Sequence, residues 1–327
     1  MNMGIDKPKL NNQLKLSVVI PVYNEKEVLP VIFTRVRSVL NLLNLDYEVI
    51  FVNDGSNDDS SEILKNFYST DNRFKMISFS RNFGHQIAVS AGLNFVKGDI
   101  VVVMDADLQD PPEVIPDLIE KWKQDYQVVY AIRKRRKENI LKKIAYRVYY
   151  QLLHRLADIN IPLDTGDFCL MDCKVVNLIN SLPERTRFIR GLRSWVGFKQ
   201  IGVEYERDKR FAGKPKYTIR KLFSLALDGL ISFSEAPLKI VIVMGFIISG
   251  LSLIYTIYAV LSRIFVDVSK QIPGWATIVV AVMFLGGVQL IIIGLIGEYI
   301  TRIFNEVKCR PLYILNEKIG FDDKNDY

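Results

Sequence analysis

Two carboxylates separated by one small residue follow an apolar run that ends abruptly. The run covers residues 100–104, and Asp105 and Asp107 come directly after it. Carboxylate oxygens suit Mg²⁺ or Mn²⁺, which proteins usually hold with one or two carboxylates together with substrate phosphates. The alternative is an acidic turn that caps a helix beginning near Pro111, since Asp is favoured just before helices.

The elements around this motif favour the metal site. Apolar runs cover residues 16–20, 48–52, 76–79, 100–104 and 128–131, and helical stretches between them cover residues 27–43, 59–68, 85–96 and 113–123. This alternation predicts an α/β domain with a mainly parallel, Rossmann-like sheet and helices on both faces. Ligands of such folds bind at the carboxyl ends of the strands, where Asp105 and Asp107 are expected.

Other strands also end in polar residues. Tyr23 follows the first run and could stack on a nucleobase, or it could cover the core as an edge aromatic. Asp54 follows the second run and could accept hydrogen bonds from a base or a ribose, although Asp-Gly is also an ordinary turn. Arg81 and Arg133 bring positive charge to the same edge. Together these residues indicate a nucleotide site.

Two long apolar segments predict a membrane hairpin. Residues 240–261 contain no charge, and residues 275–297 contain Gln289 as their one strongly polar residue. Each segment would span roughly 33 Å as a helix, enough for a bilayer core of about 30 Å. The connecting loop has two basic residues, Arg263 and Lys270, and more lie outside the hairpin, at Arg220, Lys221, Lys239, Arg302, Lys308 and Arg310. This bias predicts a multi-pass cell-membrane protein with its catalytic domain and C-terminus in the cytoplasm.

Two further segments are expected to lie in the membrane interface. Residues 140–157 combine a helical apolar period with Lys and Arg, although the same pattern also fits a helix packed on the domain core. The second amphipathic segment covers residues 218–236 and leads into the hairpin. The expected organisation is a catalytic domain (1–217), this collar (218–236), the hairpin (237–303) and a polar cytoplasmic tail (304–327) that is mobile after Asn316.

Composition narrows the choice of partners. The net charge of +7 suits phosphorylated ligands and an anionic membrane surface, and it requires no nucleic acid. The three cysteines, Cys169, Cys173 and Cys309, fit neither a disulfide framework nor a zinc site, so we expect reduced, structural thiols. Residues 1–15 are polar and lack an apolar h-region, so we expect no signal peptide there. A homo-oligomer is left open.

The motifs, taken in order, resemble a known family. They comprise residues 19–25 (VIPVYNE), 52–56 (VNDGS), 80–84 (SRNFG), 105–113 (DADLQDPPE), 165–168 (TGDF) and 210–217 (RFAGKPKY), with 233–238 and 297–299 flanking the hairpin. Together they are similar to family 2 glycosyltransferases of GT-A fold. Within that family they resemble the polyprenyl-phosphate glycosyltransferases, which include bactoprenol glucosyltransferases and dolichyl-phosphate mannose synthases. The resemblance runs from Leu16 to Pro311.

The resemblance implies roles for individual residues. The nucleotide-sugar would be bound by Pro21, Tyr23, Glu25, Asp54, Asp105, Ala106, Gln109, Arg210 and Lys216. Asp105 and Asp107 would hold Mg²⁺ or Mn²⁺, with Asp107 and Asp167 as the catalytic carboxylates, while Arg133 and Arg210 would bind the acceptor phosphate. The chain has Pro215 where the family usually has Ser or Thr, so one hydroxyl and one backbone N–H are missing from that loop.

The expected reaction is inverting transfer of a sugar, with glucose from UDP-glucose favoured, to undecaprenyl or another polyprenyl phosphate among the membrane lipids. Transfer from GDP-mannose remains an alternative. A processive polysaccharide synthase is a weaker one, because the Gln-x-x-Arg-Trp motif of those enzymes is absent. Another alternative is a membrane scaffold without catalytic activity. The presence of Asp105, Asp107 and Asp167 argues against it.

Overall fold

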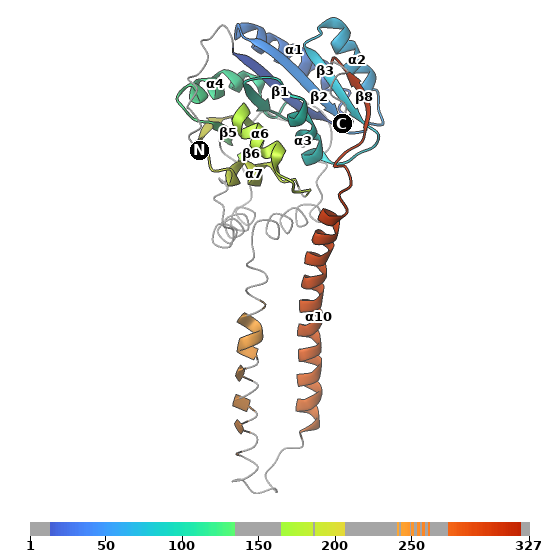
Figure 1. The fold of residues 1–327 in the computed structure, drawn as a ribbon, viewed down its shortest axis with the longest axis vertical. Coiled ribbons are helices and arrows are strands. Elements are labelled where there is room, and N and C mark those ends of the chain that lie inside the picture. Colours follow the sequence, from blue (N-terminus) through green and yellow to red (C-terminus); the bar gives the residue numbers. More distant parts are fainter. Residues whose placement is uncertain are drawn as a thin grey trace. The chain divides into compact units, whose positions relative to one another are not determined.

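The structure is a computed structural model that describes residues 14–134, 165–185, 187–206 and 274–321, with scattered residues between 241 and 261. These residues form two compact units (Figure 1). One unit is a sheet domain, which combines the described residues up to 206 with residues 311–321. The other unit is helical and lies between residues 241 and 310.

The sheet domain is built on one eight-stranded sheet, in the order β7-β5-β6-β4-β1-β2-β3-β8. The strands are β1 (Lys15–Val22), β2 (Asp46–Asn53), β3 (Phe74–Phe79), β4 (Ile100–Val103), β5 (Val128–Arg133), β6 (Thr165–Asp172), β7 (Gln200–Tyr205) and β8 (Leu315–Ile319). Strands β4, β1, β2 and β3 pair in parallel, and β7 pairs in parallel with β5. β6 is antiparallel to both β4 and β5, and β8 is antiparallel to β3. The chain therefore has the mainly parallel GT-A sheet that its sequence predicts.

Helices cover both faces of the sheet. They are α1 (Leu29–Leu42), α2 (Ser60–Thr70), α3 (His85–Phe95), the 3-10 turn η2 (Pro112–Val114), α4 (Ile115–Lys123), α6 (Cys173–Ser181) and α7 (Ile189–Trp195). α1 packs against α2 and η2, while α3 packs against α6 and α7. Alternate residues of β1 face these two layers, because Val18 belongs to the same buried core cluster as Ile32 of α1, whereas Val19 lies against Gly92 of α3. A Cβ at Gly92 would lie 2.2 Å from Cγ1 of Val19, so a larger residue there would push α3 off the sheet.

The C-terminal region differs from the free tail that we expect from the sequence. Residues 315–319 form β8, whose Met76–Ile319 and Ile77–Lys318 pairs extend the sheet beyond β3. β8 is an edge strand, so most of its side chains are half-exposed and polar residues are tolerated there. In the sequence such a polar stretch looks like a tail. The expectation of a mobile segment after Asn316 is therefore wrong for residues 317–319, which belong to β8.

The helical unit contains α10 (Trp275–Val307), a 33-residue helix that continues ten residues past the predicted end of the second span at 297. Its stretch from Phe284 to Val307 is long and apolar enough to cross a membrane. Large apolar side chains are exposed along it, with Leu290 and Ile291 each 72% exposed. Every described residue between 241 and 261 is also helical. The predicted interfacial segments 140–157 and 218–236 lie outside the described residues.

Candidate active site

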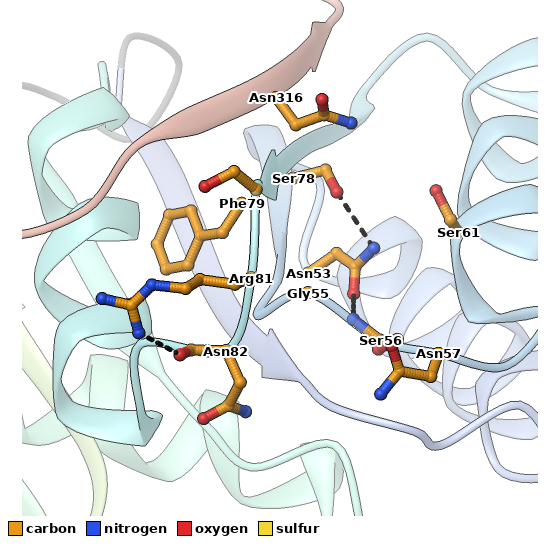
Figure 2. Close-up of a pocket in the computed structure, with 11 residues that line it drawn as sticks. Asn53, Gly55, Ser56, Asn57, Ser61, Ser78, Phe79, Arg81, Asn82 and Asn316 are labelled. Carbon is orange, nitrogen blue, oxygen red and sulfur yellow. Dashed lines mark hydrogen bonds between the residues drawn. The ribbon is translucent and has the colours of Figure 1, made fainter.

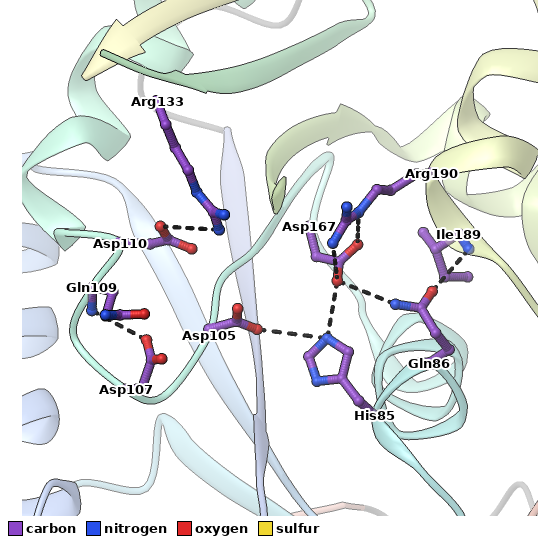
Figure 3. A network of polar contacts seen from close by, with 10 residues as sticks. All are labelled: His85, Gln86, Asp105, Asp107, Gln109, Asp110, Arg133, Asp167, Ile189 and Arg190. Atoms are coloured by element: carbon purple, nitrogen blue, oxygen red, sulfur yellow. Dashed lines mark hydrogen bonds and ion pairs between the residues drawn. The ribbon is translucent and has the colours of Figure 1, made fainter. Parts of the chain in front are cut away.

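The loop after β4 gives Asp105 and Asp107 a defined setting (Figure 3). The backbone N–H of Gln109 donates to Oδ1 of Asp107 at 3.1 Å, which is a turn held by the aspartate side chain. Leu108 has a φ of 58°, a left-handed backbone that is uncommon for a bulky residue. Its side chain and that of Ala106 are buried, so core packing fixes the loop.

Asp167 comes to the same place from β6, a strand that the periodicity of the sequence does not reveal. β6 pairs antiparallel with β4, with Val103 opposite Cys169. Continuing this register by two residues places Asp167 opposite Asp105. The sheet therefore brings together two carboxylates that are far apart in sequence, and Asp167 itself is 7% exposed.

Three side chains surround the Asp167 carboxylate (Figure 3). Nε of Arg190 donates to Oδ1 at 2.7 Å, and Nη2 donates to Oδ2 at 3.2 Å. Nε2 of His85 and Nε2 of Gln86 each lie 3.1 Å from Oδ2. Burial alone would raise the pKa of Asp167, but the positive charge of Arg190 and the hydrogen bonds from Arg190 and His85 hold it well below its ordinary value. Asp167 is therefore ionised at neutral pH and makes a poor proton acceptor.

Asp105 has a contrasting environment. Burial and the neighbouring carboxylates raise the pKa of Asp105 to about 6, although His85 acts in the opposite direction. Burial would lower the pKa of His85, but Asp105 and Asp167 raise it to about 9, so its ring is charged. Nε2 of His85 lies 3.6 Å from Oδ1 of Asp105, and that oxygen accepts no hydrogen bond from the described residues. Such a buried acceptor among other carboxylates suits a cation.

A second polar group lies at the ends of β5 and β7. The Tyr205 hydroxyl donates to the buried Oδ1 of Asp110 and accepts a hydrogen bond from Nε of Arg133 at 3.3 Å. Burial and Asp110 raise the pKa of Tyr205 well above its ordinary value, which keeps the hydroxyl protonated as a donor. Nη2 of Arg133 is 3.9 Å from Asp110. Arg133 therefore lies at the site as predicted, but Asp110 already partly balances its charge.

The predicted nucleoside residues gather at the ends of β1 and β2. Pro21 is in β1, and the loop after β1 carries Tyr23 and Glu25. This loop is bonded to the loop after β2, because the backbone N–H of Asn24 donates to Oγ of Ser56 at 2.9 Å. The backbone N–H of Glu25 donates to Oγ of Ser60 at 3.2 Å. Asp54 is 3% exposed and accepts hydrogen bonds from the backbone N–H groups of residues 83 and 84, at 2.6 and 3.0 Å. In this structure Asp54 shapes the loop after β3, and its direct contact with a nucleoside stays a prediction.

A polar pocket of about 420 Å³ opens beside these loops (Figure 2). Its lining is rich in hydroxyl and amide groups and consists of Asn53, Gly55, Ser56, Asn57, Ser61, Ser78, Phe79, Ser80, Arg81, Asn82 and Asn316. Nδ2 of Asn53 donates to Oγ of Ser78 at 3.1 Å, which joins β2 to β3 at the pocket floor. Arg81 supplies a positive charge at its rim. Asn316 comes from β8, so the C-terminal strand contributes to this wall.

Comparison with known proteins identifies the chemistry of this site. Residues 17–179 match Glycosyl transferase family 2, and residues 236–303 match the GtrB C-terminal hairpin. The chain is 46% identical to the uncharacterized glycosyltransferase YkcC of Bacillus subtilis, over 97% of this chain and 98% of that protein. It is 41% identical to the bactoprenol glucosyl transferase of Shigella phage SfV, over 93% of this chain and 99% of that protein. The chain belongs to glycosyl transferase family 2.

Solved structures resemble this glycosyltransferase more distantly. Mannosyl-3-phosphoglycerate synthase from Rubrobacter xylanophilus is 17% identical with a TM-score of 0.47, over 66% of this chain and 71% of that one. Glucosyl-3-phosphoglycerate synthase from Mycobacterium tuberculosis, in complex with UDP, is 21% identical with the same TM-score, over 67% and 79%. The assignment to the family rests on the sequence matches.

The glycosyltransferase site contains residues that the sequence analysis missed. Three of them, His85, Gln86 and Arg190, contact Asp167. The fourth, Asp110, lies near Arg133. His85 had one available signal, since it directly follows the family-like motif 80–84. Arg190 had none, because its role depends on packing of α7 against β6. Arg210, Lys216 and Pro215 lie outside the described residues, and their roles stay predictions.

Proposed function

We propose that this glycosyltransferase moves a glucosyl group from UDP-glucose to a polyprenyl phosphate, with inversion at the anomeric carbon. The similarity to bactoprenol glucosyl transferases, which extends through the hairpin, supports a polyprenyl-phosphate acceptor. The observation that carries the proposal within the site is the meeting of Asp105 with the ion-paired Asp167. This arrangement suits a donor diphosphate and an acceptor that is already anionic.

A divalent cation fits the carboxylates of Asp105 and Asp107. Asp105 offers an oxygen without a hydrogen bond among the described residues. Burial, together with the neighbouring carboxylates, raises the pKa of Asp105, and a cation would offset this cost of the charged form. Among residues that the structure describes, no cluster of three ligating side chains forms. Asp105 and Asp107 would therefore hold Mg²⁺ or Mn²⁺ together with the donor phosphates. When bound, the cation would stabilise the negative charge that develops on the leaving diphosphate.

The acceptor requires little help from a general base. A phosphate monoester is ionised at neutral pH, with a second pKa near 6. Asp167, which is kept ionised by Arg190 and His85, would act by placing these cations near the reacting groups. Attack by the acceptor oxygen on the anomeric carbon, opposite to the departing diphosphate, forms one C–O bond as the other breaks. A single displacement of this kind converts an α-linked donor into a β-linked product.

The helical unit would bring the enzyme to its lipid acceptor. α10 exposes apolar side chains over a length that can cross a membrane, and the described residues between 241 and 261 are also helical. We propose a two-helix hairpin with the sheet domain and the C-terminus in the cytoplasm. The basic residues that flank the hairpin support this orientation.

The proposal is tested with the full-length protein in detergent micelles that contain undecaprenyl phosphate. Labelled UDP-glucose, UDP-galactose and GDP-mannose are supplied separately, and the lipid product is identified by mass spectrometry. We expect glucosyl phosphoryl-undecaprenol with a β linkage, formed by the parent enzyme and lost in Asp107→Asn. A mannosyl product formed from GDP-mannose would show that the proposed donor is wrong. A polysaccharide product would show that the proposed reaction class is wrong.

A further inference from the structure

The segment after the hairpin, which we name the C-terminal strap (residues 311–321), belongs to the sheet domain and lies beside the start of the loop 80–84. Its strand β8 pairs with β3, and the pairing shifts between Ser78 and Phe79. Just past this shift the backbone N–H of Ser80 donates to the carbonyl oxygen of Ile314 at 3.0 Å. The strap therefore contacts the last residues of β3 as well as its middle, at the point where the chain turns towards the site.

Tyr313 is the strap residue with the most extensive contacts to this region. Its ring stacks on Phe79, with ring centroids 5.0 Å apart and an interplanar angle of 17°. Its hydroxyl accepts a hydrogen bond from Nδ2 of Asn94 at 3.3 Å. Phe79 ends β3, and Asn94 lies near the end of α3. Tyr313 thus joins the two elements that flank the loop 80–84.

That loop leads directly to the catalytic network. Phe83 packs edge-to-face on Phe79 at 5.6 Å, and its backbone N–H donates to Asp54. Gly84 follows with a φ of 105°, a conformation that residues with a side chain rarely adopt. His85 then begins α3 and reaches both Asp105 and Asp167. The loop is therefore held by Asp54 on one side and by Phe79, beneath Tyr313, on the other.

We propose that Tyr313 is a positioning residue for glycosyl transfer, which acts through Phe79 and Phe83 to hold His85 in register with Asp105 and Asp167. The proposal rests on the proposed function and adds a role for the C-terminal strap. Catalytic geometry is sensitive to remote changes, since a shift of about 1 Å can cost roughly 100-fold in rate. α10 ends at Val307, and Tyr313, six residues later in the sequence, already contacts Phe79 next to the loop 80–84.

The strap supplies its own control. Oε2 of Glu317 lies 3.2 Å from Nζ of Lys65 on α2, a contact that is remote from the loop 80–84. Glu317→Gln would disturb the same edge strand without touching Phe79. Tyr313→Leu removes the ring stack and keeps an apolar side chain, whereas Tyr313→Phe removes only the hydrogen bond from Asn94.

The experiment compares these three variants with the full-length parent in detergent. Glucosyl transfer gives kcat and KM, thermal unfolding gives the midpoint, and amide hydrogen exchange followed by mass spectrometry reports on peptides covering residues 80–85. We expect Tyr313→Leu to lower kcat at least roughly tenfold and to speed exchange in these peptides. Tyr313→Phe keeps the ring stack and should stay close to the parent in both measurements, and Glu317→Gln should show neither change.

A purely structural strap would give a different pattern. Tyr313→Leu would then lower the unfolding midpoint while kcat stayed within about twofold of the parent and loop exchange stayed unchanged, and this result would overturn the proposal. If Tyr313→Leu fails to fold, Tyr313→Met, which also removes the ring stack, takes its place, and unchanged kcat and loop exchange in that variant overturn the proposal. Hydrogen exchange needs no sugar donor. A parent that transfers no sugar would therefore refute the proposed function, while the exchange data alone would decide whether Tyr313 holds the loop.

Discussion

Arg190 donates two hydrogen bonds to Asp167, from Nε to Oδ1 at 2.7 Å and from Nη2 to Oδ2 at 3.2 Å. Paired bonds of this kind fix the orientation of the carboxylate as well as its charge. His85 lies on the same carboxylate, so Asp167 is paired with two cationic side chains.

Breaking this pair should be costly. Arg190→Gln would leave the 6% exposed side chain of Asp167 with His85 as its one remaining charged partner among the described residues. We expect a loss of about 3 kcal/mol in the free energy of unfolding, at the low end for buried ion pairs because Arg190 itself is 29% exposed. Denaturant unfolding of the detergent-solubilised protein measures it. Lys199→Gln, which breaks an exposed pair with Asp125, is the control and should change stability very little. Equal losses in both variants would show that burial of the Arg190 pair is unimportant.

Divalent-metal dependence should follow from the carboxylates after β4. Asp107→Asn should reduce turnover at least about 100-fold, as expected when a main electrostatic stabiliser of the transition state is weakened. EDTA should abolish activity of the parent, and added Mg²⁺ or Mn²⁺ should restore it. The exposed Asp125→Asn serves as the matched control. A parent enzyme that turns over normally in EDTA would exclude the metal role.

Stability should depend on a buried glutamate far from the chemistry. Glu48 is 2% exposed and accepts hydrogen bonds of 2.7 Å each from Ser17, Lys75 and the backbone of Lys97. Burial would raise the pKa of Glu48, but these bonds lower it below its ordinary value of 4.5. Its contribution is therefore complete above about pH 4.5 and is lost as the pH falls through the lower pKa of the folded state.

The variant Glu48→Gln tests this contribution. It should cost roughly 1.5–3 kcal/mol near neutral pH, the usual value for a hydrogen bond to a charged group. The difference from the parent should stay constant between about pH 7 and pH 5 and shrink in more acidic buffer. Thermal unfolding across this range measures it. A difference that grows on acidification would contradict the assignment.

The hairpin orientation can be checked in cells. Reporter fusions at the C-terminus and within residues 266–271 should report opposite sides of the membrane, because two spans return the chain to its starting side. Alkaline carbonate should leave the protein in the membrane fraction, since this treatment removes peripheral proteins only. Release by carbonate would rule out the spanning hairpin.

The sequence predicted the central parallel strands well because each carries a continuous apolar run that ends in polar residues. β6 was missed as a strand, although its residues 165–168 were noted as a motif. Its position between β4 and β5 follows from antiparallel pairing with both, which no local period encodes. β8 was missed because only one partner, β3, covers it, and its exposed side chains look like those of a tail.

The site shows the same limit. Asp105 and Asp107 could be found because both follow one strand, and Asp167 because its motif resembles a family. His85 lies 82 residues from Asp167, and Arg190 lies 23 residues from it, so neither partnership leaves a spacing signal. Asp54 was expected to contact the nucleoside, which stays a prediction, and its hydrogen bonds to the loop amides were not foreseen. Such assignments depend on tertiary packing rather than on residue type.

The antiparallel pairing of β8 with β3 also has a consequence for biosynthesis. During synthesis β3 emerges early, while its outer partner emerges only after both segments of the hairpin have been translated. Until then the edge of β3 presents unpaired N–H and C=O groups, which are a template for association with other chains. Completion of the sheet must therefore wait until the apolar segments have been synthesised, and a chain stalled before residue 315 would carry an open sheet edge. Truncation before residue 315 should leave a protein that is prone to aggregate even though every predicted catalytic residue is present.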